Sequence, residues 1–174
     1  MMQLRFRPVA LADAEAVAEV RVRTWQAAYA GLLPAGFLDA MDVELNADRF
    51  RQRLASPATP TNDWLLEVDG HVAGWAHIQP ASRDQDAIEG VAELCALYVL
   101  PRYWGMGLGH SMMERLSTVL RDQGAHEITL WVLADNAQAR RFYARLGFRA
   151  DGHTKEVSLV EGLSLMEVRY RRTI

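Results

Sequence analysis

The residues most clearly suited to binding a ligand are the glycines at 105, 107 and 109, which occupy every second position at the expected start of a helix. Glycine has no side chain, so a ligand can approach its backbone N–H groups closely. Unpaired N–H groups and the positive end of a helix dipole together favour an anion such as a pyrophosphate. Arg102, at the start of the same loop, would add positive charge. Residues 102–109 are therefore a candidate phosphate cradle, and a tight turn that only joins a strand to a helix is the alternative.

Two familiar phosphate-binding motifs do not fit this loop. A Walker loop requires Gly-Lys-Ser/Thr, and no such tripeptide follows Gly109. The Rossmann fingerprint places its third glycine three residues after the second, whereas these glycines fall at every second position. Residues 102–109 therefore belong to neither of these two phosphate-binding motifs.

The elements around the loop are expected to hold it between two strands. The apolar run 91–100 predicts a strand, and apolar residues four apart within 109–124 predict a helix. A further strand is expected at 127–133. Because strand, helix and strand follow in order, we expect a parallel pair of strands.

Other segments complete a mixed sheet in one domain, residues 1–174. Asp69-Gly70 favours the tight turn of a β-hairpin, and Asp13 is placed to cap the first long helix. The Pro- and Thr-rich piece 56–62 is expected to be a surface loop. The remaining helices are expected at 13–29, 35–54 and 136–146, and the remaining strands at 3–7, 63–68, 71–79, 148–152 and 163–171.

Composition argues against several classes of protein. The net charge is −3, with no run of five like charges, so the basic stripe of a nucleic-acid binder is missing. No segment reaches the roughly 18 apolar residues of a membrane helix, and the first residues lack the apolar stretch of a signal peptide. The histidines are scattered without ligand spacing, so no metal is expected. The single cysteine, Cys95, fits a cytoplasmic location.

Three motifs carry a resemblance to a known family. Arg102, Gly105 and Gly107 match the pattern Gln/Arg-x-x-Gly-x-Gly/Ala. Matching segments run from Glu93 to Val99 before the loop and from 136 to 148 after it. In this order and spacing, the motifs resemble those of the GCN5-related N-acetyltransferase (GNAT) family.

The resemblance implies a fold and a cofactor. The fold is α/β, with a mixed, mostly antiparallel sheet of six to seven strands, about four flanking helices, and a V-shaped splay between the fourth and fifth strands. The cofactor is acetyl-coenzyme A (acetyl-CoA), the acyl donor, with its pantetheine arm in the splay. Val99 would pair its backbone with pantetheine, and the Leu97 N–H would polarise the thioester carbonyl. Cofactor contacts are expected from Leu97, Val99, Arg102, Gly105, Met106, Gly107, Leu108, Gly109, His110, Asn136 and Tyr143.

Proton transfer requires further groups, because an amine attacks a thioester only as the neutral base and an amine with a pKa of about 10 is mostly charged at neutral pH. Glu93 is the candidate base, since burial could raise its pKa; a solvated carboxylate and a water chain are the alternatives. The resemblance places Tyr143 where the coenzyme A thiolate leaves, so it is the candidate acid, with a core aromatic as the alternative. Asn136 would contact pantetheine, cap its helix, or do both.

Trp25 and Tyr29 are the candidate residues for binding the acceptor amine, because they form an aromatic helix end of a kind that borders the acceptor pocket in this family. Packing in the core is the alternative. The leading hypothesis is an N-acetyltransferase acting on a primary amine of a small molecule, amino acid, peptide or protein by direct attack in a ternary complex. The second is a non-catalytic acyl-CoA-binding or sensing module, and the third a nucleotide-binding domain. Dimers are frequent in the family, and the apolar last strand would suit a homodimer.

Overall fold

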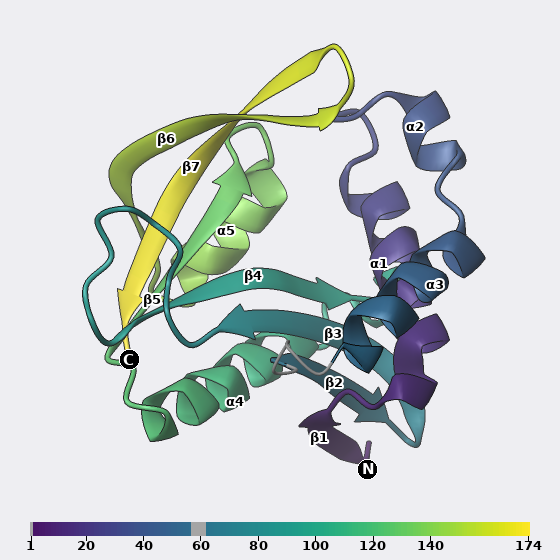
Figure 1. Ribbon diagram of the computed structural model, residues 1–174, viewed down its shortest axis with the longest axis horizontal. Coiled ribbons are helices and arrows are strands. Elements are labelled where there is room, and N and C mark those ends of the chain that lie inside the picture. The colour runs from purple at the N-terminus through teal and green to yellow at the C-terminus, as the bar shows by residue number, and fades with distance from the viewer. Residues whose placement is uncertain (1, 57–61) are drawn as a thin grey trace. The chain divides into compact units, whose positions relative to one another are not determined.

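A computed structural model describes residues 2–56 and 62–174 as a mixed α/β chain (Figure 1). Its seven strands form one sheet in the order β1-β2-β3-β4-β5-β7-β6. β4 and β5 pair in parallel, while β1 with β2, β2 with β3, β5 with β7 and β6 with β7 pair antiparallel. The expected fold class is confirmed. The surface loop expected at 56–62 lies largely outside the described residues.

The chain separates into two compact units, which are described in turn. Unit 1 comprises residues 1–77 and 96–115, and unit 2 comprises residues 78–95 and 116–174. Three elements continue from one unit into the other, namely β3 (His71–Gln79), β4 (Val91–Val99) and α4 (Leu108–Asp122).

Unit 1 carries the N-terminal strands and helices. Its further elements are β1 (Leu4–Pro8), the 3-10 helix η1 (Leu11–Asp13), α1 (Ala14–Ala28), α2 (Ala35–Asp39), α3 (Val43–Ala55), β2 (Asp63–Val68) and the 3-10 helix η2 (Pro101–Tyr103). The expected β2–β3 hairpin is confirmed, because Asp69 and Gly70 take the positive φ values (49° and 80°) that a two-residue turn requires. The helix expected at 35–54 is divided, since Asp42 starts α3 by accepting the Leu45 N–H at 2.7 Å.

Asp13 occupies the N-cap position of α1, as expected, but its side chain makes no capping hydrogen bond to that helix. Its carboxylate accepts two hydrogen bonds from the Arg7 guanidinium, at 2.7 and 2.8 Å. It also accepts the Ala10 N–H at 2.7 Å. A charged donor from the end of β1 therefore draws the carboxylate away from the helix, and Asp13 ties β1 to η1.

The core of unit 1 lies between its helices and the sheet. Its buried residues are Val9, Ala14, Val17, Ala18, Val20, Ala47, Phe50, Leu65, Trp75 and Leu100. Gly74 on β3 marks a close contact, because a Cβ there would stand 2.7 Å from Met112 Sδ and 2.9 Å from the Tyr98 carbonyl oxygen. The first half of α4 therefore packs directly on the backbone of β3.

Unit 2 consists of the C-terminal strands with α5. Its further elements are β5 (Glu127–Leu133), α5 (Ala137–Arg145), β6 (Arg149–Val160) and β7 (Leu163–Thr173). Figure 1 shows β6 and β7 as one long, twisted hairpin. β6 continues well past the end expected at Gly152, because that glycine, with φ of 89°, lies at a register shift between Ala150 and Thr154 and does not end the strand.

The expected parallel pair is confirmed within unit 2. Its register runs from Val91 opposite Glu127 to Leu94 opposite Leu130. β5 then pairs along its whole length with β7, so β5 is a central strand. Side chains of β4 and β5 that share a face can therefore be assigned from this register.

Candidate active site

The loop before α4 has the geometry expected of an anion cradle. Gly105 and Gly107 both have φ of 77°, a region that side-chain-bearing residues rarely adopt. A Cβ built on either glycine meets nothing within 4 Å, so the space beside the loop is open. Among the described residues, the first N–H of α4 with a protein acceptor is that of Ser111, which donates to the Gly107 carbonyl at 3.0 Å. The N–H groups of 105–110 have no acceptor in the described part of the chain, and those of 108–110 form the positive end of the α4 helix dipole.

The side chains of the loop differ in exposure. The Leu108 side chain is buried, so only its backbone is available to a ligand. Met106 and His110 are exposed, as is Arg102, whose guanidinium lies over the Tyr103 ring at 5.0 Å. Arg102 can therefore reach an anion without losing a buried contact.

Near the end of β4, the backbone groups of Leu97 and Val99 point away from β3. The Leu100 N–H donates to the Ala73 carbonyl of β3 at 2.8 Å. Since backbone groups alternate along a strand, those of Leu97 and Val99 point the other way. The Val99 carbonyl already accepts the Trp104 indole N–H at 2.6 Å and the Thr24 hydroxyl at 3.2 Å. Cofactor pairing at Val99 therefore falls first to its N–H.

Glu93 is buried on β4 and belongs to unit 2. The Arg83 side chain donates to both of its carboxylate oxygens, at 2.6 and 3.0 Å, and the Arg83 backbone N–H donates at 3.2 Å. Burial raises the pKa of Glu93, but the hydrogen bonds and charge of Arg83 outweigh it and hold the pKa below its usual value. The expectation of a raised pKa is therefore wrong.

Asn136 and Tyr143 lie on α5, also in unit 2. Asn136 is buried and caps the helix by accepting the Ala139 N–H at 3.0 Å, so the capping role is confirmed. The amide nitrogen of Asn136 has no acceptor among the described residues and can serve a ligand. Tyr143 is half-buried, with its ring edge-on to Phe142 at 5.1 Å and Phe148 at 5.7 Å. These contacts fix the plane of its ring.

Trp25 and Tyr29 lie together near the end of α1, with ring centroids 4.9 Å apart. Trp25 is buried, and its indole N–H has no acceptor among the described residues. A buried donor without a partner costs about 1 to 3 kcal/mol and is rare outside functional sites. Thr24, the residue before it, reaches the Val99 carbonyl, so α1 and the end of β4 meet in unit 1.

The orphan donor of Trp25 predicts an asymmetry between two buried tryptophans. Trp75, in the core of unit 1, donates its indole N–H to Asp63 Oδ1 at 2.9 Å. Trp75→Phe loses this bond to a charged acceptor, whereas Trp25→Phe removes an unsatisfied donor. We expect Trp75→Phe to lower the free energy of unfolding by about 1.5 to 3 kcal/mol more than Trp25→Phe does, measured by urea unfolding. Equal losses would mean that the Trp25 N–H has an acceptor in solution.

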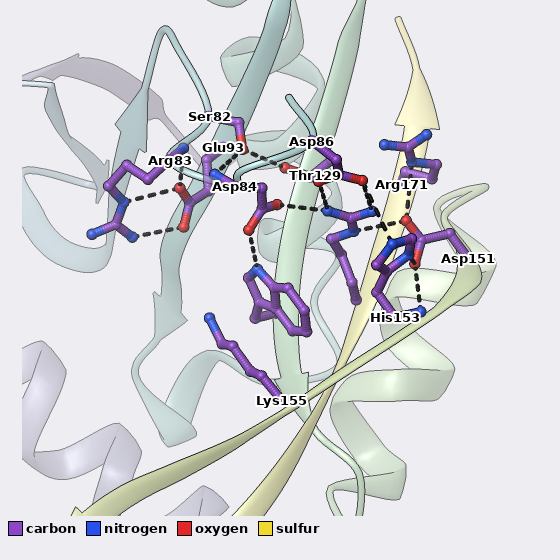
Figure 2. Close-up of polar contacts among 12 residues, drawn as sticks. Ser82, Arg83, Asp84, Asp86, Glu93, Thr129, Asp151, His153, Lys155 and Arg171 are labelled. Carbon is purple, nitrogen blue, oxygen red and sulfur yellow. Dashed lines mark hydrogen bonds and ion pairs between the residues drawn. The ribbon is translucent and has the colours of Figure 1, made fainter. Parts of the chain in front are cut away.

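Figure 2 shows a polar network in unit 2 that the sequence did not predict. Arg169 of β7 is fully buried, with ion pairs to Asp84 at 3.2 Å, Asp86 at 2.6 Å and Asp151 at 2.7 Å. Asp84 also accepts the Trp131 indole N–H at 2.9 Å. The loop after β3 is thereby fastened to the face of the sheet that carries Glu93.

A sequence signal for this face existed in the alternation of β5. Thr129 and Trp131 alternate with the buried apolar residues Ile128, Leu130 and Val132, as on a strand with one polar face. Arg83 and Asp84 gave no signal, because they lie in an irregular loop.

The network predicts acid sensitivity. Burial raises the pKa of Asp151, but hydrogen bonds from His153 and Arg169 outweigh it and hold the pKa below its usual value. A depressed folded-state pKa stabilises the protein above the unfolded-state pKa of about 3.9, and this stabilisation is lost as pH falls through the folded-state value. We expect Asp151→Asn to flatten the fall in melting temperature between about pH 5 and pH 2, relative to the unchanged protein.

The matched control for this prediction is Asp122→Asn, at the exposed end of α4, where no ion pair occurs among the described residues. It should leave the slope of melting temperature against pH unchanged. A wild-type slope in Asp151→Asn would contradict the prediction.

Two kinds of feature are absent from the described residues, a metal site and a membrane-spanning helix. They contain no group of three His, Cys, Asp or Glu side chains placed to hold a metal ion. None of their helices combines the length and apolar content that crossing a bilayer requires.

The sequence-predicted site residues thus fall into two sets. The loop 102–110, Leu97, Val99, Trp25 and Tyr29 lie in unit 1, and Glu93, Asn136 and Tyr143 lie in unit 2. A family model described as Acetyltransferase (GNAT) family matches residues 21–148, a span that takes in every residue of both sets. The chain belongs to this family. As a GNAT acetyltransferase it is an acetyl-CoA-dependent acyltransferase.

Relatives of this GNAT chain include an uncharacterized N-acetyltransferase of Mycobacterium bovis, 31% identical over 143 residues, which make up 82% of this chain and 86% of that protein. A mycothiol acetyltransferase of Arthrobacter is 36% identical over 108 residues, 56% of this chain and 32% of that protein. Among solved structures, the PaiA N-acetyltransferase of Thermoplasma acidophilum in complex with coenzyme A has a TM-score of 0.74 at 18% identity, with 99% of each chain covered. This last likeness shows the fold.

The cradle fits the cofactor of the family. Open space beside Gly105 and Gly107 and a row of N–H groups without acceptors suit a pyrophosphate. The exposed guanidinium of Arg102 adds charge of the right sign.

Proposed function

We propose that this GNAT chain transfers the acetyl group of acetyl-CoA to a primary amine of a small molecule, an amino acid, a peptide or a protein, by direct attack in a ternary complex. The observation that carries the proposal is the row of backbone N–H groups at 105–110 without an acceptor among the described residues. A pyrophosphate would satisfy these donors, and the dipole of α4 would favour its charge.

The backbone of β4 serves the acyl group in this proposal. Acetyl-CoA, when bound, supplies an activated thioester carbonyl. The Leu97 N–H points away from β3 and polarises this carbonyl, while the Val99 N–H holds the pantetheine arm. Asn136 contributes its amide nitrogen to the same arm, because its oxygen is used in capping α5.

Two side chains of unit 2 handle protons. Tyr143 donates a proton to the leaving thiolate, and its ring contacts with Phe142 and Phe148 hold the phenol in one orientation. Glu93 accepts the amine proton, directly or through water. A carboxylate has about four lone-pair sites, and Arg83 uses three of those of Glu93, so one remains for the amine or a water.

The second candidate is a non-catalytic acyl-CoA-binding or sensing module. The depressed pKa of Glu93 favours it, because burial raises that pKa less than Arg83 lowers it and the carboxylate is a weaker base than usual. The presence in one chain of the cradle residues and of a candidate proton donor, Tyr143, favours the enzyme.

Two measurements separate these functions. Calorimetry with coenzyme A, ATP or NAD, each titrated separately, tests the cradle. We expect coenzyme A to bind and ATP and NAD not to bind. Thiol release from acetyl-CoA with a panel of primary amines tests turnover, and we expect release with a subset of the panel. Coenzyme A binding without release from any amine would favour the module, and preferential binding of ATP or NAD would refute both.

A further inference from the structure

Lys155 is the only lysine of the chain and lies on β6, in unit 2. Its ammonium lies 4.1 Å from the centroid of the Trp131 ring, a cation–π contact. Its one ion pair among the described residues is with Glu167 Oε2 at 3.5 Å, and 43% of its side chain is exposed. An ammonium has three N–H donors, so this arrangement fixes its position and leaves donors for a ligand.

Lys155 shares its surroundings with Glu93. Burial raises the pKa of Glu93, whereas Arg83 and, after it, the charge of Lys155 lower that pKa. Lys155 and Glu93 therefore lie within electrostatic reach of each other. Figure 2 shows the ammonium end of Lys155 as the end nearer to Glu93 and Arg83. Arg83 is largely exposed, and its second terminal nitrogen has no acceptor among the described residues. Two cations with unused donors therefore lie near one buried carboxylate, and one of them, Lys155, lies over an aromatic ring.

This arrangement matches a ligand that carries both an amine and an anionic group. Glu93 suits the amine, and Lys155 suits an oxyanion a few bonds away. The charge of Asp84 acts on Arg83, and Glu167 pairs with Lys155, so both carboxylates would repel a doubly charged group such as a phosphate. A singly charged carboxylate is therefore the better match.

We propose that the acceptor amine is an amino carboxylate whose carboxylate binds the ammonium of Lys155. The inference rests on the proposed function, because it assigns the substrate class of that same site. Lys155 thus acts as a specificity residue, with Trp131 as the platform that positions it.

The single lysine allows a direct test of binding. Lysine selectively labelled with carbon-13 at Cε gives one side-chain signal, which belongs to Lys155. In the full-length protein saturated with coenzyme A, we expect acetate and L-amino acids to shift this signal in a saturable manner, and L-amino acid amides to leave it in place. A signal that no carboxylate moves would overturn the proposal.

Turnover gives the second readout, with each of a set of L-amino acids compared against its own amide. The amide keeps the amine and loses the negative charge. We expect Lys155→Met to lower kcat/KM for amino acids about tenfold or more and to leave the amides unchanged, while Lys155→Arg restores the preference. Arg149→Met, which removes another exposed cation of β6, is the matched control and should leave the ratio as it is.

The two failures are distinguishable. If coenzyme A binds and amines are acetylated, but the ratio of amino acid to amide is the same in Lys155→Met, this inference is wrong and the proposed function stands. If coenzyme A does not bind, the proposed function fails, whatever the lysine signal does.

Discussion

Gly107→Val is expected to lower the affinity for coenzyme A by about a hundredfold or more. Gly107 has φ of 77°, which a β-branched residue adopts only at a cost, and the open space beside it is where the pyrophosphate is proposed to lie. Valine would both strain the loop and fill that space. Loss of two hydrogen bonds to a charged group, at about 1.5 kcal/mol each, accounts for the factor.

The control for Gly107→Val must introduce the same backbone strain at a glycine outside the proposed cofactor site. Gly124, just after α4, has φ of 89° and likewise nothing within 4 Å of a built Cβ. Gly124→Val should therefore destabilise the protein similarly and bind coenzyme A normally, as measured by calorimetry. Equal affinities for the two variants would remove the cradle from the proposed function.

Tyr143→Phe is expected to lower kcat by about a hundredfold while the dissociation constant for coenzyme A stays within about twofold. Phenylalanine keeps the ring contacts with Phe142 and Phe148 and loses only the proton donor. The measurement is thiol release under conditions where chemistry limits the rate.

A second tyrosine of unit 2 supplies the comparison for Tyr143. Tyr170 is buried on β7, and its hydroxyl accepts a hydrogen bond from Arg140 at 3.1 Å. Tyr170→Phe should cost some stability and leave kcat unchanged. If Tyr143→Phe behaves in the same way, the thiolate takes its proton from elsewhere.

The parts of the site that the sequence predicted are those specified by local chemistry. Gly105 and Gly107 adopt the backbone that glycine allows, and Asp69-Gly70 makes the turn that such a pair favours. Asn136 caps α5, because an Asn before a helix needs only its own neighbours to do so. Each of these features depends on residues within one turn of the chain.

The parts that the sequence missed depend on contacts between distant residues. The pKa of Glu93 depends on Arg83, which reaches it from an irregular loop and outweighs burial. Lys155 and Trp131 meet only because β7 lies between their strands in the sheet. The partner of the Asp13 side chain was missed for the same reason, since Arg7 belongs to another element. Sequence patterns give faces and ends of elements, and the choice of partner comes from the fold.

The close approach at Gly74 limits how this part of the family can diverge. Positions 74 and 112 share one volume, because a Cβ at the first would meet the sulfur at the second. A relative can gain a methyl group at 74 only if the residue at 112 becomes smaller and the backbone at 98 also shifts, because the Tyr98 carbonyl oxygen would otherwise stand 2.9 Å from that methyl group. Since the helix that carries position 112 begins at the cofactor loop, these two interior positions should vary together wherever cofactor binding is retained.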